Sequence, residues 1–270
     1  MRNFLLELFS QNNSSLQIGL FDVWHFIYLF VTAFTAIFLS LFFKNRSESS
    51  QDKVIKIFAY LTIGLYVADF FIMPLSDSYS GISTYKLPFN ICTIMAVLVP
   101  FVEFNKKFAP IKDVVVILSV TASIMWMCYP GSALGGQPPF SYVIFQTFMY
   151  HAFLCCWGIF NFAFGRVTPT FRRMWRVLVG ILAILVWADF GNAVYGREMN
   201  WFFIETSIFP FLPDRIMPPV VVLSVFGCSL AVCGLYYAIR GIFRSLNKKG
   251  CTLTAKGSEN EAPDVSEAAE

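Results

Sequence analysis

The chain has 270 residues, of which 57% are hydrophobic and only 14% are charged, and its formal net charge is +3. A soluble domain carries about 25% charged residues, so this composition excludes an ordinary soluble protein. The small basic excess comes without a nucleic-acid-binding signature. We therefore expect membrane lipids, and no nucleic acid, as partners.

Long apolar runs recur along the whole chain. A bilayer core of ~30 Å takes about 20 apolar helical residues to cross, and helices satisfy their own backbone hydrogen bonds in lipid. The sequence therefore predicts an all-α, polytopic membrane protein with seven transmembrane helices, approximately Phe21–Phe43, Val54–Met73, Leu87–Phe104, Ile111–Cys128, Ser141–Phe164, Met174–Val194 and Pro218–Ile239. Pro88 is expected to open the third helix, in the first turn where proline is tolerated.

Lysine and arginine gather in alternate loops and in the C-terminal tail, as in residues 106–112 and 166–176. Such loops face the cytoplasm, so we predict an outer N-terminus and a cytoplasmic C-terminus. Three parts follow: an interfacial segment 1–20, a membrane domain 21–240, and a disordered tail 241–270 that is basic and then acidic. The location is the cell membrane in a bacterium, and the endoplasmic reticulum or plasma membrane in a eukaryote.

Polar side chains inside the predicted spans are costly and suggest function. Depth counted at about 1.5 Å per helical residue puts nearly all of them in the non-cytoplasmic half. We expect a polar cavity open to that side, lined by the second, third, fifth and sixth spans and containing Asp69, Asn90, Cys92, His151, Asp189 and Asn192. Asp189 and Asn192 should share one helix face, whereas Asp22 and His25 are expected at the membrane interface.

The chemistry of these residues favours acyl transfer. His151 is a candidate general base and Cys92 a candidate nucleophile. Asn90 is able to donate hydrogen bonds to an oxyanion. The remaining cysteines within the spans are typical packing residues, and Cys251 is a plain or palmitoylated tail thiol. No Cys/His spacing indicates a metal site, and no cofactor is expected.

Three stretches resemble the YwaF-like integral membrane proteins, which are related to an animal membrane acyltransferase of ether phospholipids. They are "LPFNIC" (87–92), similar to a family motif L-P-x-H-x-C, "PPFSYVIFQTFMYHAF" (138–153) and "DFGNAVYGREMNWFFIE" (189–205). The resemblance covers about residues 20–240 in layout and implicates Cys92, His151, Asn192 and Asn200. Asn90 stands where that family usually has histidine, and an amide cannot act as a base.

The leading hypothesis is thus a lipid-modifying acyltransferase with Cys92 and His151 as reactive groups and no metal. Alternatives are a small-solute or proton-coupled transporter that uses Asp69 and Asp189, and a catalytically inactive membrane scaffold. A seven-helix receptor is disfavoured because the third span ends in "VEFNKK". The loop 195–217 is either a surface-lying or re-entrant segment or an ordinary aromatic loop. A stripe of small residues predicts a helix packing partner, through Gly227, Ala231, Gly234 and Ala238.

Overall fold

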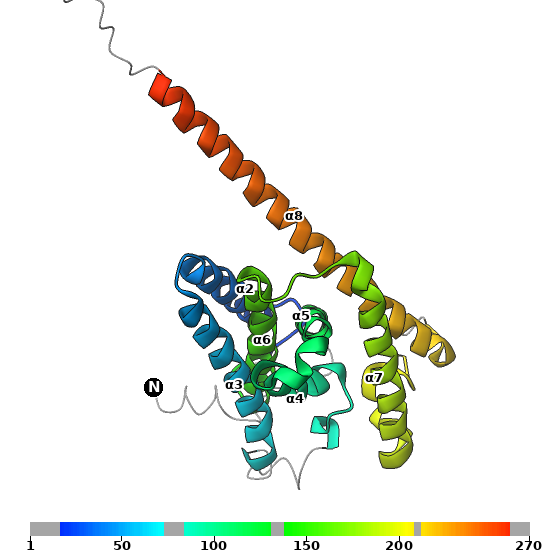
Figure 1. The fold of residues 1–270 in the computed structure, drawn as a ribbon. Coiled ribbons are helices and arrows are strands. Elements are labelled where there is room, and N and C mark those ends of the chain that lie inside the picture. The colour runs from blue at the N-terminus through cyan, green and yellow to red at the C-terminus, as the bar shows by residue number, and fades with distance from the viewer. Residues whose placement is uncertain (1–16, 73–83, 131–137, 208–211, 260–270) are drawn as a thin grey trace, which may run out of the picture.

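The structure, a computed structural model, describes residues 17–72, 84–130, 138–207 and 212–259. These ranges are helical and contain no β-strand, as predicted (Figure 1). The α-helices are α2 (Val23–Phe43), α3 (Glu48–Ile72), α4 (Ile91–Phe104), α5 (Lys112–Cys128), α6 (Tyr142–Ala163), α7 (Met174–Tyr195) and α8 (Met217–Glu259). Short 3-10 helices between them are Thr84–Lys86, Lys106–Ile111, Phe171–Arg173, Arg197–Met199, Trp201–Phe203 and Asp214–Ile216. Most of the predicted interfacial segment, residues 1–16, lies outside the described residues.

Six of these helices are long and apolar enough to cross a membrane, which confirms a multi-pass membrane protein. They are α2, α3, α5, α6, α7 and α8, and each corresponds to one predicted span. α3 begins at Glu48, earlier than the predicted Val54, because Ser47 starts the helix by accepting from the backbone amides of Ser50 and Gln51.

The predicted third span, Leu87–Phe104, contains the shorter apolar helix α4, which has 14 residues. At 1.5 Å per residue α4 is roughly 21 Å long, less than a ~30 Å bilayer core. The helix begins at Ile91, and Asn90 is its N-cap with an extended backbone (φ −89°, ψ 150°). This corrects the expectation that Pro88 opens the helix, because the chain is still non-helical between Pro88 and Ile91.

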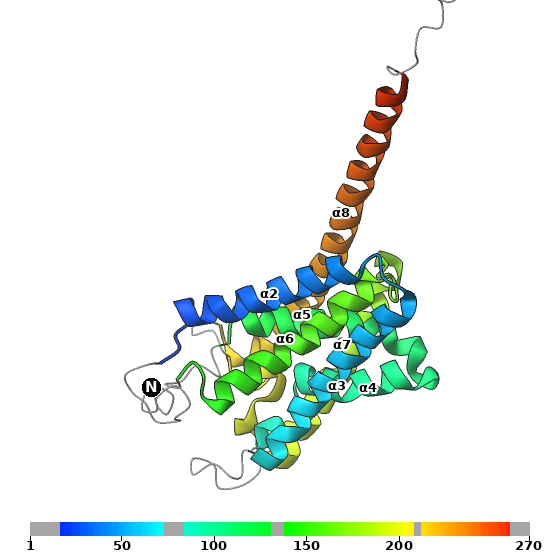
Figure 2. The same ribbon diagram turned by 90° about the vertical axis from the view of Figure 1, so that its left-hand side faces the viewer.

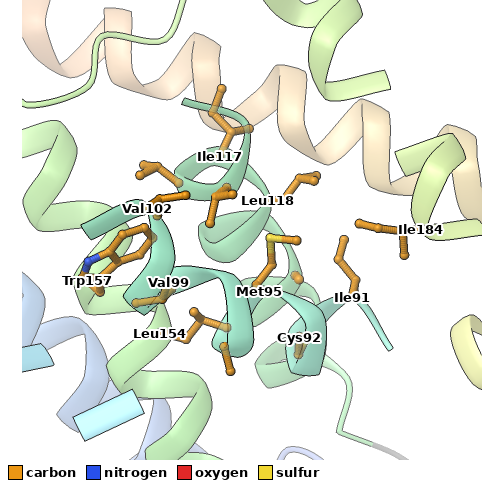
Figure 3. Packing of buried hydrophobic residues seen from close by; sticks show 14 of the residues in the cluster. Ile91, Cys92, Met95, Val99, Val102, Ile117, Leu118, Leu154, Trp157 and Ile184 are labelled. Carbon is orange, nitrogen blue, oxygen red and sulfur yellow. The ribbon is translucent and has the colours of Figure 1, made fainter. Parts of the chain in front are cut away.

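α6 is the central helix of the bundle, and α2, α3, α4 and α5 all contact it (Figure 2). Its largest buried side chains, Phe148, Trp157 and Phe160, have no exposed surface. Gly158 lets α5 approach closely, because a Cβ atom at this position would overlap the Val120 side chain. Figure 3 shows the adjoining core, where Val99 of α4, Leu118 of α5 and Leu154 of α6 point toward one another.

Large apolar side chains also cover the outside of the bundle. On α2 the rings of Phe30, Phe34 and Phe38 form a stack with centroid separations of 6.0 and 5.6 Å, and each ring is at least half exposed. Val186 of α7 and Leu223 of α8 are both 69% exposed. A contiguous apolar exterior of this kind is suited to lipid rather than to water.

The two ends of the bundle differ in their contacts. At one end, basic residues in the loops or in the first turns of the helices that follow them pair with acidic residues of the helices. The pairs are Arg166 with Asp52 at 2.9 Å, Lys112 with Glu103 at 2.9 Å, and Arg176 with Asp113 at 2.6 Å. The loops 44–47, 105–111 and 164–173 therefore lie at the same end, as expected of an up-and-down bundle. The other end carries the candidate functional residues.

α8 continues well past the predicted end of the last span. It runs to Glu259, and its C-terminal half projects beyond the other helices (Figures 1 and 2). Residues 241–259 are thus helical where a disordered tail was expected, because no proline interrupts the chain between Pro219 and Glu259. Residues 260–270 lie outside the described residues. A Cβ atom on Gly227 or Gly234 would contact nothing, and a packing partner for this stripe stays a prediction.

Candidate functional site

A buried ion pair joins α3 to the segment before α4. Lys86 Nζ lies 2.6 Å from Asp69 Oδ2, and the Asp69 side chain is only 1% exposed. Lys86 Nζ also donates to Gln146 Oε1 of α6 at 3.2 Å. A charge removed from water needs a partner, so the ammonium, the carboxylate and the amide hold one another in place. Three segments that are distant in sequence meet at this point.

Two tyrosines complete this arrangement. Tyr66, one turn before Asp69, donates its hydroxyl to the Lys86 carbonyl at 2.8 Å. Tyr150 of α6 lies near Tyr66 and Asp69, and its buried hydroxyl has no hydrogen-bond partner among the described residues. Most buried polar groups are hydrogen-bonded, so the unpartnered Tyr150 hydroxyl is an exception among the buried groups of the bundle. We call Tyr66, Asp69, Lys86, Gln146 and Tyr150 the polar cluster.

His151 borders the polar cluster on α6. Its ring stacks on Trp126, with 3.9 Å between centroids and 7° between planes. Nδ1 lies 2.7 Å from the Thr147 carbonyl oxygen. Because a carbonyl only accepts, Nδ1 must carry the proton, and the lone pair of the neutral ring is on Nε2. Lys86 lies near the same imidazole. The predicted general base is therefore buried and oriented, with its lone pair on Nε2.

Cys92 lies in the first turn of α4 and is 8% exposed. Figure 3 shows it beside Ile91 and Met95 in the apolar core. Its thiol is near Tyr150 of the polar cluster. Within the described part of the chain, no hydrogen bond joins this thiol to His151, whose Nδ1 bonds to Thr147 instead. Cys92 thus reaches the polar cluster through Tyr150, and no direct thiol–imidazole pair is formed.

The three candidate asparagines all bind backbone. Asn90 Oδ1 accepts from the Phe202 amide at 2.9 Å. Asn192 Oδ1 accepts from the Trp201 amide at 2.8 Å, and its Nδ2 donates to the Trp201 carbonyl at 3.3 Å. Asn200 Oδ1 accepts from the amides of Glu205 and Thr206 at 2.9 and 3.0 Å. These side chains organise the segment after α7 rather than line a cavity.

Asp189 lies apart from the polar cluster. Its side chain is 60% exposed and is 3.6 Å from Arg197, which also pairs with Glu205 at 2.5 Å. The hydrogen bond with Glu205, and then its charge, raise the pKa of the Arg197 guanidinium. These three residues line an open pocket of about 350 Å³ with Leu185, Val186, Ile204 and Pro218. Asn192, one turn further along α7, is fully buried, so the protein covers Asn192 and leaves Asp189 exposed.

Asp22 and His25 form a helix cap rather than an interfacial pair. Asp22 Oδ1 accepts from the His25 amide at 2.8 Å at the start of α2. His25 is fully buried, with Nε2 donating to the Met127 carbonyl at 2.7 Å and Nδ1 accepting from the Phe21 amide at 3.0 Å. The expectation of an interfacial position is corrected for His25, because the ring is inserted between α2 and the end of α5.

Sequence reasoning missed Lys86, Gln146 and Tyr150. Lys86 follows a predicted span that contains an acidic residue about one turn from its end. That acidic residue, Asp69, requires a cation nearby, and this requirement is the signal that points to Lys86. Among the described residues, no group of three or more His, Cys, Asp or Glu side chains is placed to hold a metal ion.

Comparison with known proteins adds one assignment. No curated protein matches the chain, and no solved structure matches it. The model of the TMEM164 family matches residues 20–239, from the beginning of α2 into α8. This match covers most of the chain and every helix that carries a candidate residue, so the protein belongs to the TMEM164 family.

Proposed function

We propose that this member of the TMEM164 family is a membrane enzyme that transfers acyl chains between phospholipids, with Cys92 as its nucleophile. The observation that carries the proposal is the buried Asp69–Lys86 pair, with Tyr150 near both Asp69 and the buried Cys92 thiol. Buried ionisable groups in a membrane protein are costly and mark functional sites. The resemblance of residues 87–92 and 138–153 to YwaF-like proteins supplies the reaction class.

Acyl transfer through a thiol takes two balanced steps. The Cys92 sulfur attacks the ester carbonyl of a donor phospholipid, the ester C–O bond breaks, and the thiol proton passes to the lysolipid hydroxyl. The hydroxyl of an acceptor lysolipid then attacks the thioester. Its proton returns to the sulfur as the C–S bond breaks, and the enzyme is regenerated without a further reactant.

The neighbouring groups suit these steps. A buried thiol is protonated at rest, so its attack requires a proton acceptor, and His151 has its lone pair on Nε2. The unpartnered Tyr150 hydroxyl is a donor for the oxyanion that forms at the carbonyl carbon.

The proposal includes a topology, with seven membrane segments, the N-terminus outside and the C-terminus in the cytoplasm. The ion pairs of Arg166, Lys112 and Arg176 support it, because these basic residues lie at one end of the bundle. The polar cluster then opens toward the non-cytoplasmic leaflet, where the donor and acceptor phospholipids reside.

The test compares phospholipid acyl profiles of cells that lack the protein and express single variants. Cys92→Ser should abolish the profile that the parent protein restores, and His151→Ala should reduce transfer by at least ~100-fold, the usual contribution of a general base. Cys155→Ser is the matched control, because Cys155 is another buried thiol of the bundle and is only 3% exposed. It should behave as the parent.

Parent-like profiles from both Cys92→Ser and His151→Ala would refute the proposal. They would leave the inactive scaffold as the better account. The transporter hypothesis receives no specific support, because Asp69 is neutralised by Lys86 and Asp189 is exposed and paired with Arg197. Proton-gradient-dependent uptake into proteoliposomes would favour it nonetheless.

A further inference from the structure

A single side chain links the start of α4 to the segment that follows α7. Asn90 precedes α4 directly, and its Oδ1 accepts from the Phe202 amide at 2.9 Å. A backbone amide only donates, so the oxygen of the Asn90 amide must face Phe202. We call residues 196–207 the outer loop. Cys92 lies two residues after Asn90. The hydrogen bond between Asn90 and Phe202 therefore connects the outer loop to the backbone that carries the proposed nucleophile.

The outer loop is fixed to the bundle from a second side. Asn192, near the end of α7, bonds to both the amide and the carbonyl of Trp201, and Trp201 is completely buried. The ring of Phe89 lies 4.6 Å from that of Trp201 and 5.1 Å from that of Trp187, between centroids. Trp187 in turn donates to the Pro88 carbonyl at 2.7 Å. The residues just before α4 are thereby enclosed by α7 and the outer loop.

The backbone of the outer loop is held in an unfavourable conformation. Phe202 and Phe203 have positive φ angles of 61° and 55°, in the left-handed region that is rare for side chains of this size. Such residues persist only where the surrounding contacts over-determine them, and they cluster at functional sites. The contacts that do so here include the bond from the Phe202 amide to Asn90.

From this geometry we infer that Asn90 is a positioning residue, which uses the outer loop to fix the first turn of α4 and so the Cys92 thiol. The inference rests on the proposed role of Cys92 and deepens it. It assigns Asn90 a role that does not require a base, and it makes the outer loop a part of the catalytic apparatus that touches no reacting atom.

Two readouts on the full-length protein in detergent micelles test the coupling from both sides. One is the rate at which N-ethylmaleimide labels Cys92, measured on the corresponding peptide by mass spectrometry. The other is the rate of tryptic cleavage after Arg197 in the outer loop. Neither readout requires catalysis, so each is independent of whether acyl transfer occurs.

Asn90→Ala should raise both rates by about tenfold. This change corresponds to a decrease of ~1.4 kcal/mol in the free energy needed to open the local structure. Asn90→Asp should leave tryptic cleavage near the parent rate, because a carboxylate oxygen still accepts from the Phe202 amide and suits the start of a helix. Asn192→Ala should raise labelling of Cys92, although Asn192 lies on another helix. That reciprocal effect is expected only if the outer loop and α4 are coupled.

Asn200→Ser is the matched control within the outer loop. Within the part of the chain that the structure describes, the Asn200 side chain bonds to Glu205 and Thr206, which belong to the outer loop itself. Its replacement should therefore raise cleavage after Arg197 and leave labelling of Cys92 unchanged. Labelling of Cys155 reports general loss of the fold. If either alanine variant exposes Cys155, Asn192→Asp decides, since it removes only the donor to the Trp201 carbonyl and should still raise labelling of Cys92.

An unchanged cleavage rate in Asn90→Ala, or an unchanged Cys92 labelling rate in the Asn192 variants, overturns the inference. If both rates move as expected while Cys92→Ser leaves lipid profiles unaltered, the coupling stands and the proposed function fails. In an active enzyme, Asn90→Ala should lower kcat more than it raises KM, and Asn90→Asp should restore part of kcat.

Discussion

The two histidines of the chain are both buried, yet their rings are held in different ways. His25 uses both ring nitrogens, one toward Phe21 and one toward Met127. His151 uses only Nδ1, toward Thr147. The His25 ring joins two segments through both of its nitrogens, whereas the Nε2 atom of His151 has no hydrogen-bond partner among the described residues. The hydrogen-bond partners of the two rings, rather than their residue type, distinguish the structural His25 from the catalytic candidate His151.

Variants of the Asp69–Lys86 pair test how much each buried charge depends on the other for stability. Lys86→Met leaves the Asp69 carboxylate buried without its cation, and the free energy of unfolding should fall by ~3–5 kcal/mol. Unfolding in mixed detergent micelles, followed by tryptophan fluorescence, measures this change. The double variant Asp69→Leu/Lys86→Met should regain most of the loss, because it removes both charges.

Arg197→Met provides the comparison for an exposed pair. Arg197 and Asp189 are each at least 60% exposed, and Arg197 also pairs with Glu205, whose side chain is 18% exposed. Exposed pairs stabilise a fold less than buried ones, so Arg197→Met should destabilise the protein less than Lys86→Met. Equal losses from Lys86→Met and Arg197→Met would contradict a buried, desolvated pair. A double variant as unstable as Lys86→Met alone would show that the loss does not come from the unpaired charge of Asp69.

At the scale of single residues, the sequence predicted which polar side chains are costly within a span more reliably than it predicted their interaction partners. It singled out Asp69, Cys92 and His151 because each is expensive or reactive within a span, and the structure groups them around the polar cluster. It did not pair Asp69 with Lys86, because Lys86 lies beyond the span and reaches back into it. Asn90 and Asn192 were placed in a cavity because hydrogen bonds to a distant loop leave no periodic pattern in the sequence.

At the scale of elements, the contact between α5 and α6 depends on the absence of one side chain. Gly158→Ala would place a Cβ atom onto the Val120 side chain and within 3.2 Å of the Val116 carbonyl oxygen. Overpacking of a tight interface costs about 1–3 kcal/mol. We expect Gly158→Ala to lower the thermal unfolding midpoint of the purified protein.

Gly64→Ala is the matched control, since Gly64 lies in the interior of α3 and a Cβ atom there would contact nothing. Alanine has the higher helix propensity by about 1 kcal/mol, so Gly64→Ala should leave the midpoint unchanged or raise it. The assignment of a close α5–α6 contact would be wrong if the two variants had the same effect.

The predicted helices were accurate in their centres and less so at their ends. Hydropathy locates a long apolar run, but α4 begins at Ile91 because the backbone around Pro88 and Asn90 bonds elsewhere. The last span was predicted to end at Ile239, where the apolar residues stop. The backbone hydrogen bonds of α8 continue to Glu259, because they do not depend on hydrophobicity. Composition therefore predicted membrane segments, while helix limits depended on local backbone geometry.

At the scale of the whole molecule, the asymmetry of the two ends determines a testable topology. The basic loops pair with acidic residues at one end, and the polar cluster lies at the other. A peptide tag after residue 270 should be reached by antibody only after cells are permeabilised, whereas a tag before residue 1 should be reached in intact cells. A tag between Phe104 and Lys112 should behave like the C-terminal tag. Staining of the C-terminal tag in intact cells would reverse the proposed orientation.

The shortness of α4 has a consequence for how the protein responds to different membranes. A lipid-facing helix adjusts its tilt or depth when bilayer thickness changes. The first turns of α4 are instead enclosed by protein, with Ile91, Cys92 and Met95 buried, so neighbouring helices set their depth. Longer or shorter lipid chains act on the exteriors of α2, α7 and α8, while the Cys92 thiol keeps its place among its neighbours.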